Sequence, residues 1–155
     1  MLDASPLILF ARVGRLVLIE RLAPALLIPN AVLKEVRAGR QKDPTAAIAL
    51  TWAEHYAVDD MALMATIERW DLGSGEAQVI AHSIGGRRWA VLDDLLARRC
   101  ALAHDVPVIG SLGIVLRAKK HRIIAEVRPM IKDLVAAGMF LDDELANRVL
   151  AIVGE

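Results

Sequence analysis

The sequence contains little cysteine, no excess of either charge and no long uninterrupted apolar run. Its single cysteine, Cys100, has no internal disulfide partner, which favours a reducing compartment and predicts a cytoplasmic protein. Nineteen Lys and Arg residues balance nineteen Asp and Glu residues, so any RNA contact requires a local basic patch. Glu20 and Arg21 interrupt the apolar stretch from Leu16 to Pro29, so no membrane-spanning segment is expected.

Histidine and aromatic residues are also sparse. The four histidines have no Cys or second His at the spacing of a zinc site, and none suggests a nucleophile triad. The three tryptophans lie within apolar segments, so we expect them to pack in the core rather than to stack on bases. They are Trp52, Trp70 and Trp89.

Apolar residues, in contrast, are abundant. They make up 55% of the chain, and the mean hydropathy is +0.42, whereas soluble domains average roughly 45–50% apolar residues. A chain of 155 residues is expected to form a single domain that buries about 70% of its unfolded surface. The apolar excess predicts a surface that faces a partner subunit, and we expect a homodimer.

Short strand-like runs alternate with longer helical segments. Strands are expected near Leu2 and at 26–28, 57–58, 89–92 and 106–109. Helices are expected at 7–11, 31–38 after an Asn30 cap, 44–53, 61–70, 77–84 and 94–104, with three more after a turn at Gly110–Gly113. This alternation predicts an α/β sandwich around a mainly parallel sheet.

Five carboxylates lie where a strand-like run gives way to a helical one. They are Asp3, Glu35, Glu76, Asp93 and Asp94. Parallel strands gather their carboxyl ends along one edge of a sheet, so these distant residues are expected to meet in one pocket. Closely spaced carboxylates repel one another unless a cation compensates, and oxygen ligands suit Mg²⁺ or Mn²⁺.

Each acid also has a structural interpretation. Asp93 and Asp94 are both suited to cap the helix that follows, and Glu76 to interact with a helix dipole. Glu35, in a second helical turn, would lie on a solvated face, and Asp3 would cap the helix at Pro6. The sequence leaves these alternatives open.

Other polar residues are secondary candidates. Ser5 and Ser111 would contact a phosphate or a metal-bound water, although Ser beside a helix start is usually a cap. Arg98 and Arg99, and the cluster from Arg117 to Arg122, would contact phosphates. A solvated helix face is the favoured interpretation of these basic residues.

Several fragments occur in an order that resembles a known family. They are Asp3-Ala4-Ser5-Pro6-Leu7, Ile28-Pro29-Asn30-Ala31-Val32 with Glu35, Leu72-Gly73-Ser74-Gly75-Glu76-Ala77, Leu92-Asp93-Asp94 with Ala97-Arg98, and Gly110-Ser111-Leu112-Gly113. Together they resemble the PIN-domain superfamily, the fold of VapC-type toxin ribonucleases. The resemblance is strongest to a prokaryotic branch with GxGEA and G[ST]LG turns.

The resemblance implies a three-layer α/β/α sandwich that hydrolyses RNA with Mg²⁺ or Mn²⁺ and is restrained by a small antitoxin protein. By position, Asp3, Glu35 and Glu76 look like the first three acids, and Asp93 or Asp94 like the fourth. Many PIN domains place Ser or Thr two residues before that fourth Asp, whereas Leu92 stands there if Asp94 is the ligand. The register favours Asp94 as the ligand and Asp93 as the helix cap, although the exchange is open.

Three functions are consistent with these features. The favoured one is a VapC-type endoribonuclease, and the alternative is a PIN-like scaffold that binds RNA or protein without cleavage. An aspartyl-phosphate mechanism at Asp3 or Asp93 ranks last, because it requires a Lys after a later strand and Gly110–Gly113 offers none.

Overall fold

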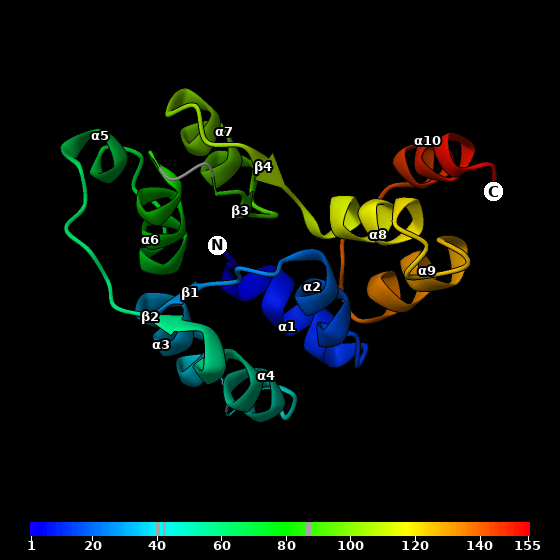
Figure 1. Ribbon diagram of the computed structural model, residues 1–155, viewed down its shortest axis with the longest axis horizontal. Coiled ribbons are helices and arrows are strands. Elements are labelled where there is room, and N and C mark those ends of the chain that lie inside the picture. Colours follow the sequence, from blue (N-terminus) through cyan, green and yellow to red (C-terminus); the bar gives the residue numbers. More distant parts are fainter. Residues whose placement is uncertain (40, 42, 86–87) are drawn as a thin grey trace.

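The computed structural model describes residues 1–39, 41, 43–85 and 88–155 (Figure 1). The helices are α1 Ala4–Arg12, α2 Leu16–Leu22, α3 Asn30–Gly39, α4 Ala46–Ala53, α5 Ala65–Glu68, α6 Ser74–Ser83, α7 Leu95–Ala103, α8 Ser111–Lys120, α9 Arg128–Ala136 and α10 Asp143–Val153, with a 3₁₀ helix at Glu54–Tyr56. The strands are β1 Ile28–Pro29, β2 Ala57–Val58, β3 Ala90–Val91 and β4 Val108–Ile109.

The strands are short and parallel, and Leu2 joins them into one array. β1 pairs with β2, and β3 pairs with β4. The Leu2 amide donates to the Leu27 carbonyl at 3.2 Å, and the Asp3 amide donates to the Val91 carbonyl at 3.2 Å. The spatial order is therefore β2, β1, Leu2, β3, β4. The next strands in the sequence, β1 and β2, lie on one side of Leu2, and β3 and β4 lie on the other. Leu2 is therefore at the topological switch point, where α/β proteins bind ligands.

Helices cover both faces of this array. In Figure 1, α5, α6 and α7 lie on one side of the line of strands, and α1 to α4 lie on the other with α8. Leu2, Phe10, Ile28, Val32 and Leu92 are completely buried between these layers. The predicted α/β sandwich is confirmed. Among the residues that the structure describes, no helix has both the length and the apolar character needed to cross a bilayer.

Two predictions about single residues have different outcomes. Cys100 is completely buried in α7, as expected for a packing residue, and burial raises the pKa of its thiol. Trp52 and Trp70 pack against the core, but Trp89 is 44% exposed. The prediction that Trp89 is a core residue is wrong.

The predicted helix at 61–70 is also wrong, because only Ala65–Glu68 is helical. The side chain of Gln78, buried in α6, donates to the Met61 carbonyl at 2.7 Å and accepts from the Met61 amide at 2.9 Å. These two bonds satisfy the Met61 backbone outside a helix. The 61–64 segment can therefore remain irregular without unpaired polar groups.

The glycine-containing turns begin helices. The segment Gly110–Gly113 was predicted to be a turn, but α8 already begins at Ser111. Gly110 alone lies outside the helix, as its N-cap residue. A Cβ at Gly113 would lie 2.6 Å from Cγ1 of Ile109, so glycine permits α8 to pack closely on β4. Similarly, α6 begins at Ser74 rather than at Ala77.

Candidate functional site

Asp3 occupies the switch point of the sheet, directly after Leu2. Its side chain is 3% exposed, and its Oδ1 atom is buried without a hydrogen-bond partner in the described structure. Burial raises the pKa of this carboxyl to about 7, and the negative charges of Glu76 and Glu35 act in the same direction. The backbone amides of Ala4 and Ser5 oppose this rise only in part.

Glu35 projects from α3 to the N-terminus of α6. It accepts hydrogen bonds from the Gly75 amide at 2.7 Å and from the Ser74 hydroxyl at 3.2 Å. A helix N-terminus favours a nearby carboxylate, so α6 holds Glu35 by its unpaired amides and its dipole. The interpretation of Glu35 as part of a solvated helix face is therefore wrong.

The N-terminus of α3 is itself held by a residue from another segment. Asp60 accepts from the Ala31 amide at 2.8 Å, whereas Asn30 donates its side-chain amide to Asp59 at 3.0 Å. Asp60, and not the predicted Asn30, is thus the capping side chain. The cap fixes the start of the helix that carries Glu35.

Glu76 lies in the first turn of α6, beside Glu35. It accepts from the Gly73 amide at 3.1 Å. Burial raises the pKa of its carboxyl, and the charges of Asp94 and Glu35 raise it further. A Cβ at Gly73 would lie 3.5 Å from Oε1 of Glu35 and 3.5 Å from Oε2 of Glu76, so the two carboxylates converge on this glycine.

The two adjacent acids after β3 have different roles from those predicted. Asp94 is the N-cap of α7 and accepts from the Ala97 amide at 2.8 Å, so the prediction that Asp93 caps this helix is wrong. Asp93 instead accepts from the amide of Ser111 at 2.7 Å and from its hydroxyl at 2.6 Å. Asp93 therefore connects the end of β3 to the start of α8, and Ser111 is engaged in this bond. Leu92 is a core residue.

The structure brings four of the five acids into one electrostatic group. Asp3, Glu35 and Asp94 each interact with Glu76, while Asp93 faces Ser111 and Ser5 is exposed. Within residues 1–39, 41, 43–85 and 88–155, no Lys or Arg forms an ion pair with these four acids. Over the same residues, no three Asp, Glu, His or Cys side chains are close enough to hold a metal ion together.

The comparison with protein families decides what this fold is. The model of the PIN-domain family DUF3368 matches residues 1–155. The chain belongs to the PIN-domain family. No curated protein and no solved structure matches it. PIN domains are generally nucleases that use divalent metal ions, so family membership indicates a nuclease-like hydrolase.

The chemistry of the donor atoms in this PIN domain suits a divalent cation, although no three of the described acidic side chains are close enough to share one ion. The donor atoms are carboxylate oxygens, which Mg²⁺ and Mn²⁺ prefer, and the buried Oδ1 of Asp3 has no other partner. Glu35, Glu76 and Asp94 are turned towards backbone amides, which supply part of the positive potential that the acids require. Among these four acids, Asp3 has a buried side-chain oxygen without a hydrogen-bond partner in the described structure.

The sequence pattern did not identify the residues that support the site of this PIN domain. Asp60 and Gln78 are not among the predicted site residues, although Asp60 follows the strand-like run 57–58 by two residues, as Asp94 follows the run 89–92. Arg98 was favoured as a solvated residue. A Cβ at Gly110 would lie 2.7 Å from Nη1 of Arg98 and 3.0 Å from Oδ1 of Asp93, so these two side chains flank the start of α8.

Proposed function

We propose that this PIN domain is a metal-dependent endoribonuclease of the VapC toxin type. The observation that carries the proposal is the buried, unpartnered Oδ1 of Asp3 within a group of four acids. Burying a carboxylate without a counter-charge costs free energy. A cationic ligand that supplies the counter-charge would explain why an acid occupies this buried position.

The four acids would divide the work of holding a cation. Asp3, together with Glu35 on α3, Glu76 on α6 and Asp94 at the start of α7, would hold the ion. A bound Mg²⁺ or Mn²⁺ would supply Lewis acidity towards the phosphodiester and would lower the pKa of the water that hydrolyses its P–O ester bond. Asp93 is assigned a positioning role, because both of its oxygens are bonded to Ser111.

The partner proposals rest on exposed apolar side chains. Phe140 is 95% exposed, and Ile152, Leu102 and Leu95 are 75%, 62% and 61% exposed. Such surface commonly marks a protein interface. We therefore include a homodimer and a small antitoxin partner in the proposal. The cytoplasmic location in the proposal rests instead on the single cysteine, Cys100.

A second function, RNA or protein binding without cleavage, is favoured by one observation. Glu35, Glu76 and Asp94 already accept hydrogen bonds from backbone amides. If these bonds persist in the presence of metal, the acids remain structural and the domain acts as a scaffold.

Cleavage of labelled single-stranded RNA by the purified protein, with Mn²⁺ or Mg²⁺ and with EDTA, separates the two functions. We expect metal-dependent cleavage that falls to background in Asp3→Asn and Asp94→Asn. Asn caps helices about as well as Asp, so the second change removes a charge and keeps the cap. Asp133→Asn, an exposed change on α9, is the matched control. Full activity in both site variants would defeat the nuclease proposal, whereas RNA binding without any cleavage by the wild type would favour the scaffold.

A further inference from the structure

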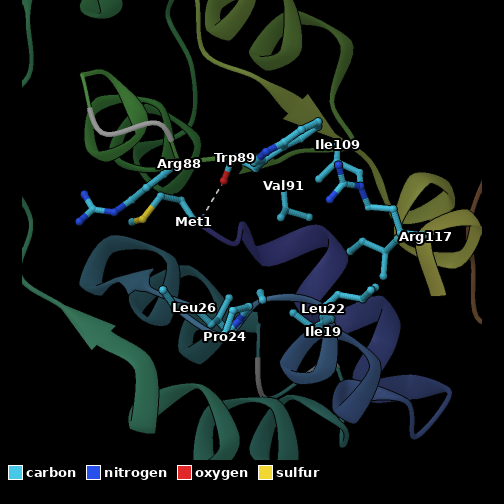
Figure 2. Close-up of a pocket in the computed structure, with 13 residues that line it drawn as sticks. Met1, Ile19, Leu22, Pro24, Leu26, Arg88, Trp89, Val91, Ile109 and Arg117 are labelled. Carbon is cyan, nitrogen blue, oxygen red and sulfur yellow. Dashed lines mark hydrogen bonds between the residues drawn. The ribbon is translucent and has the colours of Figure 1, made fainter. Parts of the chain in front are cut away.

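A cavity of about 270 Å³ lies against β3, β4 and the segments that precede β1 and β3. Met1, Leu26 and Trp89, which precede the strand residues Leu2, Ile28 and Ala90, are among its lining residues. Figure 2 shows Trp89, Val91 and Ile109 along one wall and the side chains of α2 and the following segment along the other. The walls are apolar, and none of the four acids lines them.

The two ends of this cavity are basic. Figure 2 shows Arg88 at one end and Arg117 at the other. The guanidinium carbon of Arg117 lies 4.3 Å from the centroid of the Trp89 ring. Neither arginine forms an ion pair with another described residue, and no Asp or Glu is among the residues that line the cavity. The cavity is thus an apolar slot with uncompensated positive charge.

The geometry points to a binding site for a small organic carboxylate with a flat apolar body. The body would lie between the two walls, and the carboxylate would meet Arg117. A guanidinium is planar and binds carboxylates through two parallel hydrogen bonds, and stacking on Trp89 orients it before a ligand arrives. The volume is near the lower end of small-molecule sites, which span about 300–1,000 Å³, so the ligand has one or two rings.

This site is separate from the nuclease proposal in both position and chemistry. The acidic group lies at the carboxyl ends of the strands and attracts cations, whereas the cavity attracts anions. Its occupancy can be measured without metal and without RNA. Failure of one proposal therefore leaves the other untouched.

Calorimetric titration with 2-naphthoate and with its uncharged amide tests the inference. We expect saturable one-site binding of the acid that is at least about tenfold tighter than binding of the amide. Arg117→Gln should remove this preference by weakening the acid about tenfold, and Ala23→Phe, which fills the slot, should weaken both probes. Arg99→Gln makes the same charge change on α7 outside the cavity and should bind both probes as the wild type does.

Three results would overturn the inference. The first is the absence of saturable binding of the acid at millimolar concentrations to folded wild-type protein. The second is equal affinity for acid and amide, or an unchanged acid affinity in Arg117→Gln. The third is a change of oligomeric state in Ala23→Phe by sedimentation, which would make the cavity an interface between copies of this chain. Circular dichroism verifies that each variant is folded.

Discussion

At the residue scale, Asp3 combines burial with charge. Its pKa is raised from 3.8 to about 7, so the unfolded chain loses this proton at lower pH than the folded protein does. In the absence of metal, the folded state is therefore destabilised as the pH rises from about 4 to about 7. The full cost is on the order of 4 kcal/mol, because each pKa unit corresponds to about 1.4 kcal/mol. A cation beside Asp3 would remove this cost.

Gly75 allows Glu35 to approach α6, and a methyl group there should displace the carboxylate. In Gly75→Ala the new Cβ would lie 2.6 Å from Oε2 and 3.1 Å from Oε1 of Glu35. The flexible end of Glu35 can move away, so we expect an unfolding free energy within about 1 kcal/mol of the wild type. Glu35 should nevertheless lose the hydrogen bond from the backbone amide at position 75. Calorimetry should then show Mn²⁺ binding that is about tenfold weaker or more.

Gly73→Ala is the matched control for that change. Its Cβ would lie 3.5 Å from the oxygens of Glu35 and Glu76, an ordinary contact distance. We expect Mn²⁺ affinity close to that of the wild type. Equal losses in the two variants would show that any added methyl group disturbs the turn, and would contradict a specific role for the approach of Glu35 to Gly75.

The residues of the candidate site were predictable to different degrees. Asp3 was identifiable because it lies at a strand-to-helix junction, a feature that is local in sequence. Glu76 was identifiable from the glycine-containing turn before its helix, although α6 follows α5 and not, as predicted, a strand. The cap of α7 was assigned to Asp93 instead of Asp94, because the cap is decided by whether α7 starts one residue earlier or later. Asp93 accepts two hydrogen bonds from Ser111 only because β3 lies beside β4. No local sequence pattern specifies this pairing of strands.

At the element scale, one carboxylate joins three helices near the end of the described chain. Glu155 follows α10 and accepts hydrogen bonds from Lys119 of α8 at 2.8 Å and from the amides of Val127 and Arg128 at 2.9 Å. Arg128 begins α9, so the carboxylate lies at the positive end of that helix. These donors, Lys119 first, lower the pKa of Glu155 to about 2.

We expect Glu155→Gln to lower stability at neutral pH and to have a smaller effect in acid. Because the folded pKa is about 2 and the ordinary value is 4.5, the stabilising interaction is fully present above pH 4.5 and is lost as the pH falls towards 2. Urea unfolding of both proteins at a series of pH values between 7 and 3 measures the difference. The gap between the two curves should be largest at pH 7.

Glu144→Gln is the control, because Glu144 is 82% exposed and only 3.9 Å from Arg148, an arrangement that contributes little. Its unfolding curve should overlay that of the wild type. Coincident curves for Glu155→Gln and wild type at pH 7, or a gap that grows on acidification, would rule out the proposed role of the Glu155 carboxylate.

Helix prediction from sequence failed where a distant side chain replaced local hydrogen bonds. The segment 61–70 has helical spacing, yet its first residues pair with Gln78 and only Ala65–Glu68 forms a helix. In contrast, α3 and α7 begin and end close to their predicted limits, because their apolar faces and polar ends are encoded locally. Local patterns thus predicted most elements, and the exceptions required knowledge of tertiary neighbours.

At the scale of the whole molecule, the candidate site exists only because the sheet is assembled. The four acids are Asp3 and one residue each from α3, α6 and the start of α7. Together they span most of the first hundred residues of the sequence. The alternating pattern predicted the parallel sheet, and the parallel sheet predicted that its carboxyl ends would meet. The orientation of each carboxylate was not predictable, because it depends on which backbone amide its neighbouring helix presents.

A cation held by these four acids should therefore stabilise the entire fold. A ligand that binds only the folded state adds about 2.7 kcal/mol at a concentration one hundred times its Kd, which for a chain of this length raises the unfolding temperature by roughly 5–10 °C. Scanning calorimetry with and without Mn²⁺ measures this rise within each variant. We expect it in the wild type and in Asp133→Asn, and we expect it to disappear in Asp3→Asn, because Asp3 supplies the buried oxygen that has no other partner. A rise of equal size in Asp3→Asn would place Mn²⁺ elsewhere on the molecule, and the acids would then be explained by their hydrogen bonds to helix starts alone.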